Sequence, residues 1–130
     1  MGILSAEDRK LLSEPQLAHV ATVAADGSPH VTPVWIDVDG DYILFNTAKG
    51  RVKYQNMVRD PRVGISVVDR DNDYRTLCVK GTVELIEEGA DPHIDKLAKK
   101  YLGADTYPFR KPGEVRVIVR VTPTERLATN

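Results

Sequence analysis

The chain has 130 residues, of which 18 are Lys or Arg and 19 are Asp or Glu, so its formal net charge is −1. A nearly neutral chain has no global positive field to attract nucleic acid or anionic lipid, and any anion-binding site must therefore be local. One cysteine and three scattered histidines exclude an intrachain disulfide and provide no metal-ligand spacing.

The length also bounds the organisation of the protein. It fits a single cofactor-binding domain over residues 1–130, with no room for separate cofactor and substrate domains. Because a domain of this size keeps much of its surface exposed, its active site is often completed by a second copy, and we expect a homodimer. The sequence has no apolar stretch typical of a signal peptide or a membrane span, so we expect a cytoplasmic protein without a membrane partner.

The first half of the sequence predicts a short helix followed by strands. Ser5 begins a Ser-x-x-acid spacing, which is typical of a helix N-cap. Alternating apolar residues then predict three strands, over residues 17–24, 29–38 and 41–47. Asp-Gly pairs separate them, which is typical of hairpin turns and predicts a meander. Pro33 lies inside the second strand and cannot donate a ladder hydrogen bond, so we expect an edge, a bulge or a barrel corner there.

The second half predicts two further helices and the remaining strands. The helices are expected over residues 48–61 and from an Asp91 cap to Gly103. The strands are expected over residues 62–69, 75–86, 115–122 and 125–128. Since the order of elements shows no βαβ alternation, it predicts an all-β fold, a closed barrel of six or seven antiparallel strands with accessory helices.

The most informative stretch carries three cations, Lys49, Arg51 and Lys53, where a strand passes into a helix. Cations oppose the positive end of a helix dipole, so this cluster is locally unfavourable unless an anion neutralises it. Arg offers a two-pronged donor, Lys a point charge and Thr47 a hydroxyl, a set suited to one phosphate group. An exposed charged turn is the alternative interpretation, and the strand-to-helix context favours a phosphate site.

Several segments, taken in this order, resemble the pyridoxamine 5'-phosphate oxidase-like split β-barrel proteins. They are residues 17–22 (LAHVAT), 26–29 (DGSP), 31–35 (VTPVW), 45–53 (FNTAKGRVK), 56 (N) and 59–61 (RDP). The resemblance is greatest to the branch that uses the deazaflavin coenzyme F420. It implies an FMN-binding-like split β-barrel and an oxidoreductase activity.

The resemblance also implies a cofactor site at the interface between two subunits. The phosphate contacts of the family match Arg51 and Lys53, and residues 33–35 match the strand beside the ring system. Tyr74 and Arg75 match side chains presented by the second subunit, and a simple strand start is the alternative interpretation. The predicted cofactor-binding residues are Pro33, Val34, Trp35, Asn46, Thr47, Lys49, Arg51, Lys53, Tyr74 and Arg75.

Other polar and aromatic residues leave alternatives open. Arg116, Arg120 and Arg126 could contact a polyanionic tail, but alternating arginines are typical of the solvent face of a strand, and we expect them there. Trp35 would either pack on a cofactor ring or fill a dimer core. We predict no catalytic side chain and no metal ligand, because in such enzymes the cofactor carries the reactive centre.

Three functions are compatible with these features. The first is an F420-dependent reductase that passes a hydride from the reduced deazaflavin to a small conjugated organic acceptor. The second places FMN in the same site and gives a flavin reductase or oxidase. The third is a non-catalytic protein that stores or carries a cofactor or a haem-like ligand.

Overall fold

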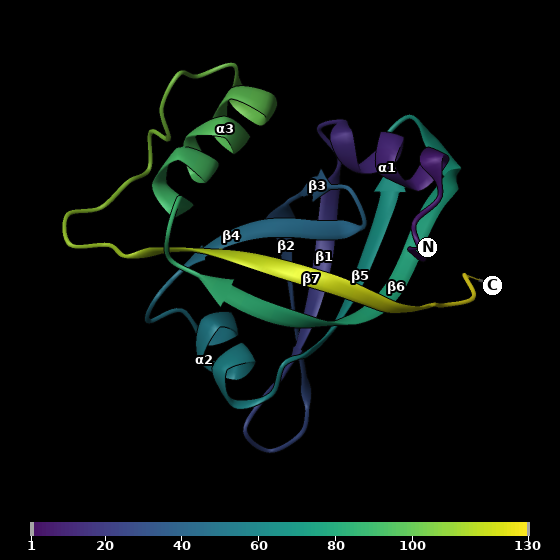
Figure 1. The fold of residues 1–130 in the computed structure, drawn as a ribbon, viewed down its shortest axis with the longest axis horizontal. Coiled ribbons are helices and arrows are strands. Elements are labelled where there is room, and N and C mark those ends of the chain that lie inside the picture. The colour runs from purple at the N-terminus through teal and green to yellow at the C-terminus, as the bar shows by residue number, and fades with distance from the viewer. Residues whose placement is uncertain (1, 130) are drawn as a thin grey trace.

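Residues 2–129 form one curled antiparallel sheet with three helices around it in the computed structural model of the protein (Figure 1). The strands are β1 (Leu17–Val23), β2 (Pro29–Trp35), β3 (Asp37–Asp39), β4 (Tyr42–Ala48), β5 (Arg62–Asp69), β6 (Asn72–Ile86) and β7 (Arg116–Arg126). The helices are α1 (Ala6–Ser13), α2 (Val52–Arg59) and α3 (Ala90–Leu102). The strand order is β2-β1-β5-β6-β7-β4-β3, which confirms the predicted all-β fold of six or seven antiparallel strands with accessory helices; the number is seven.

The sheet is split between β2 and β3 rather than closed all the way round. These two strands are its opposite edges, yet only Ile36 separates them in the chain. The single strand predicted over residues 29–38 is therefore two strands, and the predicted meander ends at this corner. Pro33 lies opposite His19 on β2, which is an edge strand. An edge strand tolerates a residue that has no amide hydrogen to donate to a neighbouring strand.

Side chains of α3 hold the corner at Ile36. The Ile36 amide donates a hydrogen bond to the Tyr101 hydroxyl at 2.9 Å, and its carbonyl accepts one from Lys100 Nζ at 2.6 Å. Trp35 stacks on the Tyr101 ring with centroids 5.2 Å apart. Burial lowers the pKa of Lys100 to about 8 and raises that of Tyr101 to about 12. Two half-buried side chains thus replace the strand partner that the corner lacks.

The other two helices, α1 and α2, lie at opposite ends of the barrel (Figure 1).

The ends of the helices test the predicted caps. As predicted, α1 begins with a capping box, in which Ser5 Oγ accepts from the Asp8 amide at 3.1 Å and the Asp8 carboxylate accepts from the Ser5 amide at 2.9 Å. The predicted Asp91 cap of α3 is wrong, because the N-cap is Gly89 with a φ of 78°. Gly103 ends α3 in the left-handed conformation, as expected.

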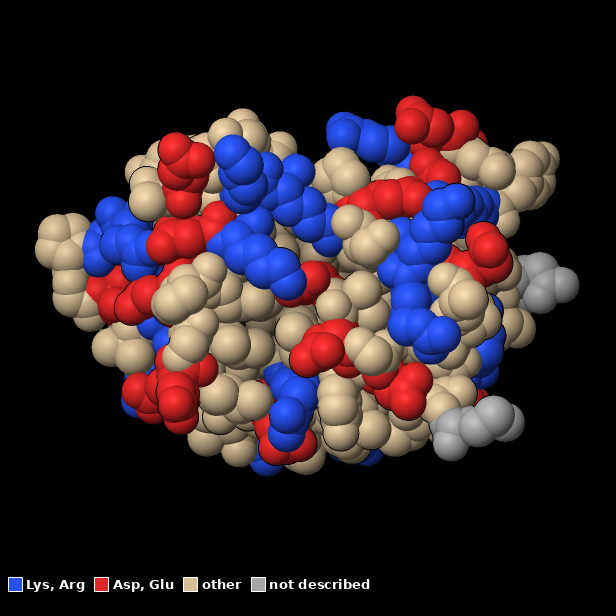
Figure 2. Space-filling view, turned by 45° about the horizontal axis from the view of Figure 1, so that its top comes forward, with Lys and Arg blue, Asp and Glu red and all other residues tan. Residues whose placement is uncertain are grey.

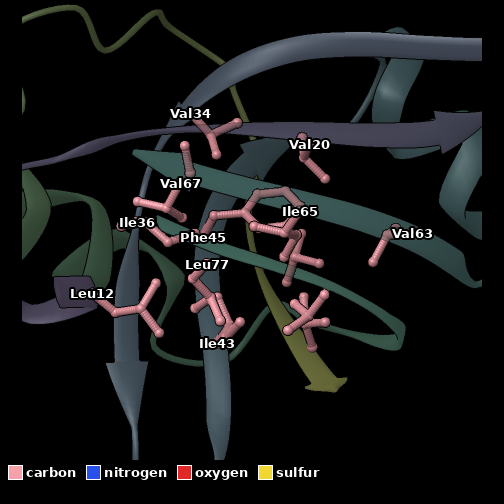
Figure 3. Close-up of a cluster of buried hydrophobic side chains, with 14 of the residues drawn as sticks. Leu12, Val20, Val34, Ile36, Ile43, Phe45, Val63, Ile65, Val67 and Leu77 are labelled. Carbon is pink, nitrogen blue, oxygen red and sulfur yellow. The ribbon is translucent and has the colours of Figure 1, made fainter. Parts of the chain in front are cut away.

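The core lies inside the curl of the sheet and is built on strand alternation. Phe45 of β4 is fully buried at its centre, and Ile65 and Val67 of β5 lie around it (Figure 3). Successive residues of a strand face opposite sides, so Asn46 points outward from the sheet when Phe45 points inward. The outward face of β4 is therefore available to line a site.

The long strands β6 and β7 pair through a bulge at Gly81. β7 is one continuous strand in place of the two that were predicted, and it carries an extra residue, Thr124, where the register shifts. Pro123 lies opposite Gly81 in this bulge, a position that tolerates a residue without an amide donor. A Cβ at Gly81 would overlap the backbone carbonyl of Thr122. The bulge thus requires glycine.

We expect Gly81→Ala to lower the free energy of unfolding by about 2 kcal/mol, because the sheet must move apart to admit the methyl group. Gly64→Ala is the matched control, since its Cβ would meet only the Ala21 Cβ, at 3.9 Å. Urea unfolding followed by circular dichroism measures both variants. Equal stability of the two variants would contradict this account of the bulge.

Candidate functional site

A pocket of about 300 Å³ opens where the barrel is split, between β2 and β4 and against α3. One side is apolar and aromatic, with Trp35 from β2, Leu97 from α3, and Tyr107 and Phe109 from the loop over residues 103–115. The other side is polar and is formed by Asn46, Arg51, Lys53 and Arg116. The pocket thus combines a surface for a flat ring with a surface for an anion.

The loop over residues 103–115 is fixed to α3. The Tyr107 amide donates to Asp95 Oδ1 at 2.8 Å, and Arg110 pairs with both Asp91 and Asp95 at 2.7 Å. The ring of Tyr107, in the loop, meets the ring of Trp35, on β2, edge to face, with the ring centroids 6.0 Å apart. These contacts hold the aromatic side of the pocket in place.

Several of the predicted cofactor-binding residues come together in this pocket. They are Pro33, Val34, Trp35, Asn46, Arg51 and Lys53. They come from β2, β4 and the start of α2, which the fold of the sheet brings together at its open side. The two phosphate contacts expected from the resemblance, Arg51 and Lys53, thus lie in the same cavity as the strand expected to run beside the ring.

Two neighbouring predicted residues point elsewhere. Thr47 alternates with Asn46 on β4 and is buried on the core side, where its hydroxyl has no hydrogen-bond partner among residues 2–129. Lys49 Nζ pairs with Glu87 Oε2 at 2.7 Å, a hydrogen bond that raises the pKa of Lys49. Of the three cations predicted at the start of α2, only Arg51 and Lys53 line the pocket.

Tyr74 and Arg75 lie outside the pocket of their own chain. Tyr74 is 96% exposed, whereas Arg75 donates to Glu14 Oε1 at 2.6 Å and to Asp69 Oδ2 at 2.8 Å. These contacts explain why the pKa of Arg75 is raised. That Tyr74 and Arg75 reach the site of a second copy stays a prediction.

The polar side of the pocket has an excess of positive charge. Among residues 2–129, Glu114 is the one carboxylate that pairs with the cations lining the pocket, at 3.7 Å from Arg51 Nη2 and 3.1 Å from Arg116 Nη1. Burial and the charges of Arg51 and Arg116 lower the pKa of Lys53. Elsewhere, on the face shown in Figure 2, positive side chains lie among negative ones. An anion that enters the pocket would relieve a local repulsion.

Arg116 was placed wrongly by the sequence, which predicted it on a solvent face. Its side chain is only 3% exposed, and its guanidinium lies 5.2 Å from the centre of the Tyr107 ring. Arg120, four residues along β7, fits the prediction better, since it pairs with Glu84 and covers the Tyr42 ring. The alternation along β7 gives both arginines the same orientation, so their different burial comes from the residues that surround each one.

Behind the pocket, a row of buried polar side chains connects Asn46 to Asp37. His93 of α3 lies between them, with Nδ1 at 3.1 Å from Asn46 Nδ2 and Nε2 at 3.1 Å from Asp37 Oδ2. Burial alone would raise the pKa of Asp37, but hydrogen bonds from His93 and the Val38 amide, with the charge of Lys96, lower it to about 2. Asp37 is therefore ionised at neutral pH. No spacing in the sequence indicated this row, because its members are far apart in the chain.

The family model of pyridoxamine 5'-phosphate oxidase matches residues 4–130. The chain belongs to this family. No curated protein matches the sequence.

Solved structures of the family resemble this chain over nearly its whole length. An F420 reductase is 36% identical, with a TM-score of 0.80, and the match covers 92% of this chain and 94% of that one. A conserved hypothetical protein from Mycobacterium tuberculosis is 26% identical, with a TM-score of 0.69 over 95% of this chain and 83% of that one. HupZ of Group A Streptococcus, at 23% identity and a TM-score of 0.67 over 98% and 96%, shares the fold. The split barrel is thus confirmed.

Membrane-spanning helices and metal-binding groups are both absent from the described residues. Across residues 2–129, no helix has the length and apolar character needed to cross a membrane. The same residues contain no group of three or more His, Cys, Asp or Glu side chains that could hold a metal ion.

The ionised Asp37 predicts a pH dependence of stability. Its folded pKa of about 2 lies below the value of 3.8 for the free side chain, so its contribution is present above pH 3.8 and is lost as the pH falls through 2. The difference corresponds to about 2 kcal/mol. Asp37→Asn should therefore be less stable than the wild type at pH 7. The difference in free energy of unfolding between the two proteins should become smaller between pH 4 and pH 2. Thermal unfolding across this range measures this difference, and parallel curves would contradict the assignment.

Proposed function

We propose that this protein is a coenzyme F420-dependent oxidoreductase that passes a hydride from reduced deazaflavin to a small conjugated organic acceptor. The observation that carries the proposal is the pocket that joins Arg51, Lys53 and Arg116 to an aromatic wall. The 36% identity to an F420 reductase supports the same conclusion. A cofactor that has a flat ring at one end and a phosphate further along fits both halves of the pocket.

Arg51 and Lys53 would hold the phosphate. Arg51 is the N-cap of α2 and provides no side-chain cap, so the first amides of this helix are left to add to the positive field at the pocket. Guanidinium and ammonium groups together form charge-assisted hydrogen bonds with a phosphate. The excess of positive charge among the side chains that line the pocket is the physical reason to expect such an anion.

The aromatic side chains would hold the ring. Trp35 and Tyr107 offer an apolar surface on which a flat ring can pack, and Phe109 extends it. Burying the ring there excludes water from its reactive edge. When bound, a deazaflavin supplies hydride transfer, so the protein needs to provide position and shielding rather than an acid or a base.

Binding of F420 and of FMN, followed by fluorescence, tests this proposal. We expect the wild type to bind F420 more tightly than FMN, and Arg51→Ala, Lys53→Ala to lose about a hundredfold or more in affinity, since each charged hydrogen bond contributes about 1.5–3 kcal/mol. Arg70→Ala, Lys99→Ala is the matched control, because it removes the same charges from exposed positions outside the pocket. This control should bind like the wild type.

Other results would select a different function. A preference for FMN would make the protein a flavin reductase or oxidase. Tight binding of F420 without oxidation of the reduced cofactor by any conjugated acceptor would make it a non-catalytic carrier. If neither cofactor binds, or if both double variants bind like the wild type, the cofactor assignment is wrong.

We propose further that a second copy of the chain covers the outer face of β1 and β2 and completes the site. Leu17, which lines the pocket, is 54% exposed on this face, and Val31 is 57% exposed further along it. Val31 lies opposite Ala21, and Ala21 lies opposite Gly64 of β5, so this face carries mainly small and apolar residues, with the exposed His19 between Leu17 and Ala21. Such a face is suited to a self-complementary contact around a two-fold axis.

Val31→Lys should weaken this dimer, because the contact would then bury an unpaired charge. Val58→Lys on α2 is the control, since Val58 is 61% exposed on another part of the surface. Sedimentation velocity over a range of concentrations measures the effect. A wild type that stays monomeric at high concentration would refute the proposed dimer.

A further inference from the structure

We propose that Asp37, His93 and Asn46 act as a row of positioning residues that holds Arg116 in the pocket as a third contact for the anionic group of the ligand. This rests on the proposed function in one respect only, that an anion enters the pocket. In this arrangement His93 sets the affinity for the anion without touching it.

The row begins at a carboxylate that accepts every hydrogen bond it makes. Asp37 is buried, and its oxygens lie 2.9 Å from the Val38 amide, 3.2 Å from Lys96 Nζ and 3.1 Å from His93 Nε2. An ionised carboxylate can only accept, so His93 Nε2 carries a proton and donates it. The position of this proton decides what the other ring nitrogen can do.

In the neutral ring His93 Nδ1 is then an acceptor that faces the amide group of Asn46. Asn46 Nδ2 has two hydrogens and two acceptors in reach, His93 Nδ1 at 3.1 Å and the Ala90 carbonyl at 3.0 Å. Turning the amide over would set its oxygen against the Ala90 carbonyl and its hydrogens against Arg116 Nε. The orientation with Oδ1 toward Arg116 is therefore the one that satisfies every group.

Arg116 is fixed at two of its three nitrogens, and the third is free for a ligand. Its Nε donates to Asn46 Oδ1 at 2.8 Å and its Nη1 to Glu114 Oε1 at 3.1 Å. Its Nη2 has no hydrogen-bond partner among residues 2–129, although the side chain is 3% exposed and lines the pocket. This nitrogen is open to the pocket rather than fully buried, so an anion that enters the pocket would accept a charge-assisted hydrogen bond from it.

All hydrogen bonds of the row point the same way. Arg116 donates to Asn46, Asn46 donates to His93, and His93 donates to Asp37. Bonds aligned in one direction polarise one another, which strengthens the acceptor at Asn46 Oδ1. Loss of the His93 acceptor would leave one Asn46 Nδ2 hydrogen without a partner, so that the Ala90 carbonyl alone would hold the amide group and the contact that sets the guanidinium plane would weaken.

The first test is made on the ligand-free protein. Long-range proton–nitrogen NMR correlations of the His93 ring at neutral pH report which nitrogen carries the proton. We expect the neutral tautomer with its proton on Nε2. A proton on Nδ1 would remove the His93 acceptor from Asn46 Nδ2 and would overturn the proposal, whatever the pocket binds.

The second test separates the anion contact from packing. Coenzyme F420 is compared with its phosphate-free deazaflavin riboside, and FMN with riboflavin, on His93→Leu, His93→Gln and Arg116→Gln. We expect His93→Leu to lose about tenfold in affinity for the phosphate-bearing ligand and Arg116→Gln to lose more, with the phosphate-free ligand bound as by the wild type. His93→Gln keeps one acceptor and one donor and should retain most of the affinity.

Each contrary result overturns the proposal. If His93→Leu weakens both ligands of a pair equally, His93 acts through packing alone. If His93→Leu keeps the selectivity for phosphate while Arg51→Ala, Lys53→Ala loses it, the pocket binds an anion as proposed but the row does not position Arg116. If the wild type itself shows no selectivity for phosphate, the anion site and the role of Arg116 are both wrong.

Discussion

The corner at Ile36 is the constraint on which the rest of the structure depends. At this one residue the chain leaves one edge of the sheet and becomes the opposite edge, so the barrel stays split there. The backbone groups of Ile36 are satisfied by Tyr101 and Lys100 of α3 instead of by a strand. α3 is thereby fixed beside the split, and the pocket is the space between α3 and the two strand ends.

The site then follows from alternation along β4. Phe45 and Thr47 point into the core, while Asn46 between them points out toward α3 and meets both His93 and Arg116. A single strand therefore ties the packing of the barrel to the polar side of the pocket. The excess of positive charge on that side is tolerated because Glu114 balances part of it, and the remainder is what an anionic ligand would neutralise.

The sequence was a good guide wherever local periodicity or local chemistry determines structure. Period-2 patterns located the strands, and the Ser5 capping box located the first helix. The cations of residues 46–53 led to the pocket because strand, turn and helix start are neighbours in the chain. Lys49 was the exception, since its partner Glu87 lies after β6 and no local pattern pairs the two.

The sequence failed where contacts between distant segments decide the outcome. Arg116 looks like any outward residue of β7, yet Asn46, Tyr107 and Glu114 bury it. The break at Ile36 was missed because the residues on both sides of it are good strand formers, and only the opposite pairing of β2 and β3 reveals two strands. Trp35 was predicted on the aromatic side of the pocket, whereas Tyr107 and Phe109 were missed, since residues 103–115 have no periodic pattern.

The central claim is that the phosphate and the ring of a deazaflavin occupy the two halves of one pocket at the split of the barrel. A crystal structure of the protein with coenzyme F420 tests it most directly. The account predicts the phosphate within hydrogen-bond distance of Arg51, Lys53 and Arg116, and the ring against Trp35 and Tyr107. A phosphate bound elsewhere, or a ring outside this pocket, would contradict it.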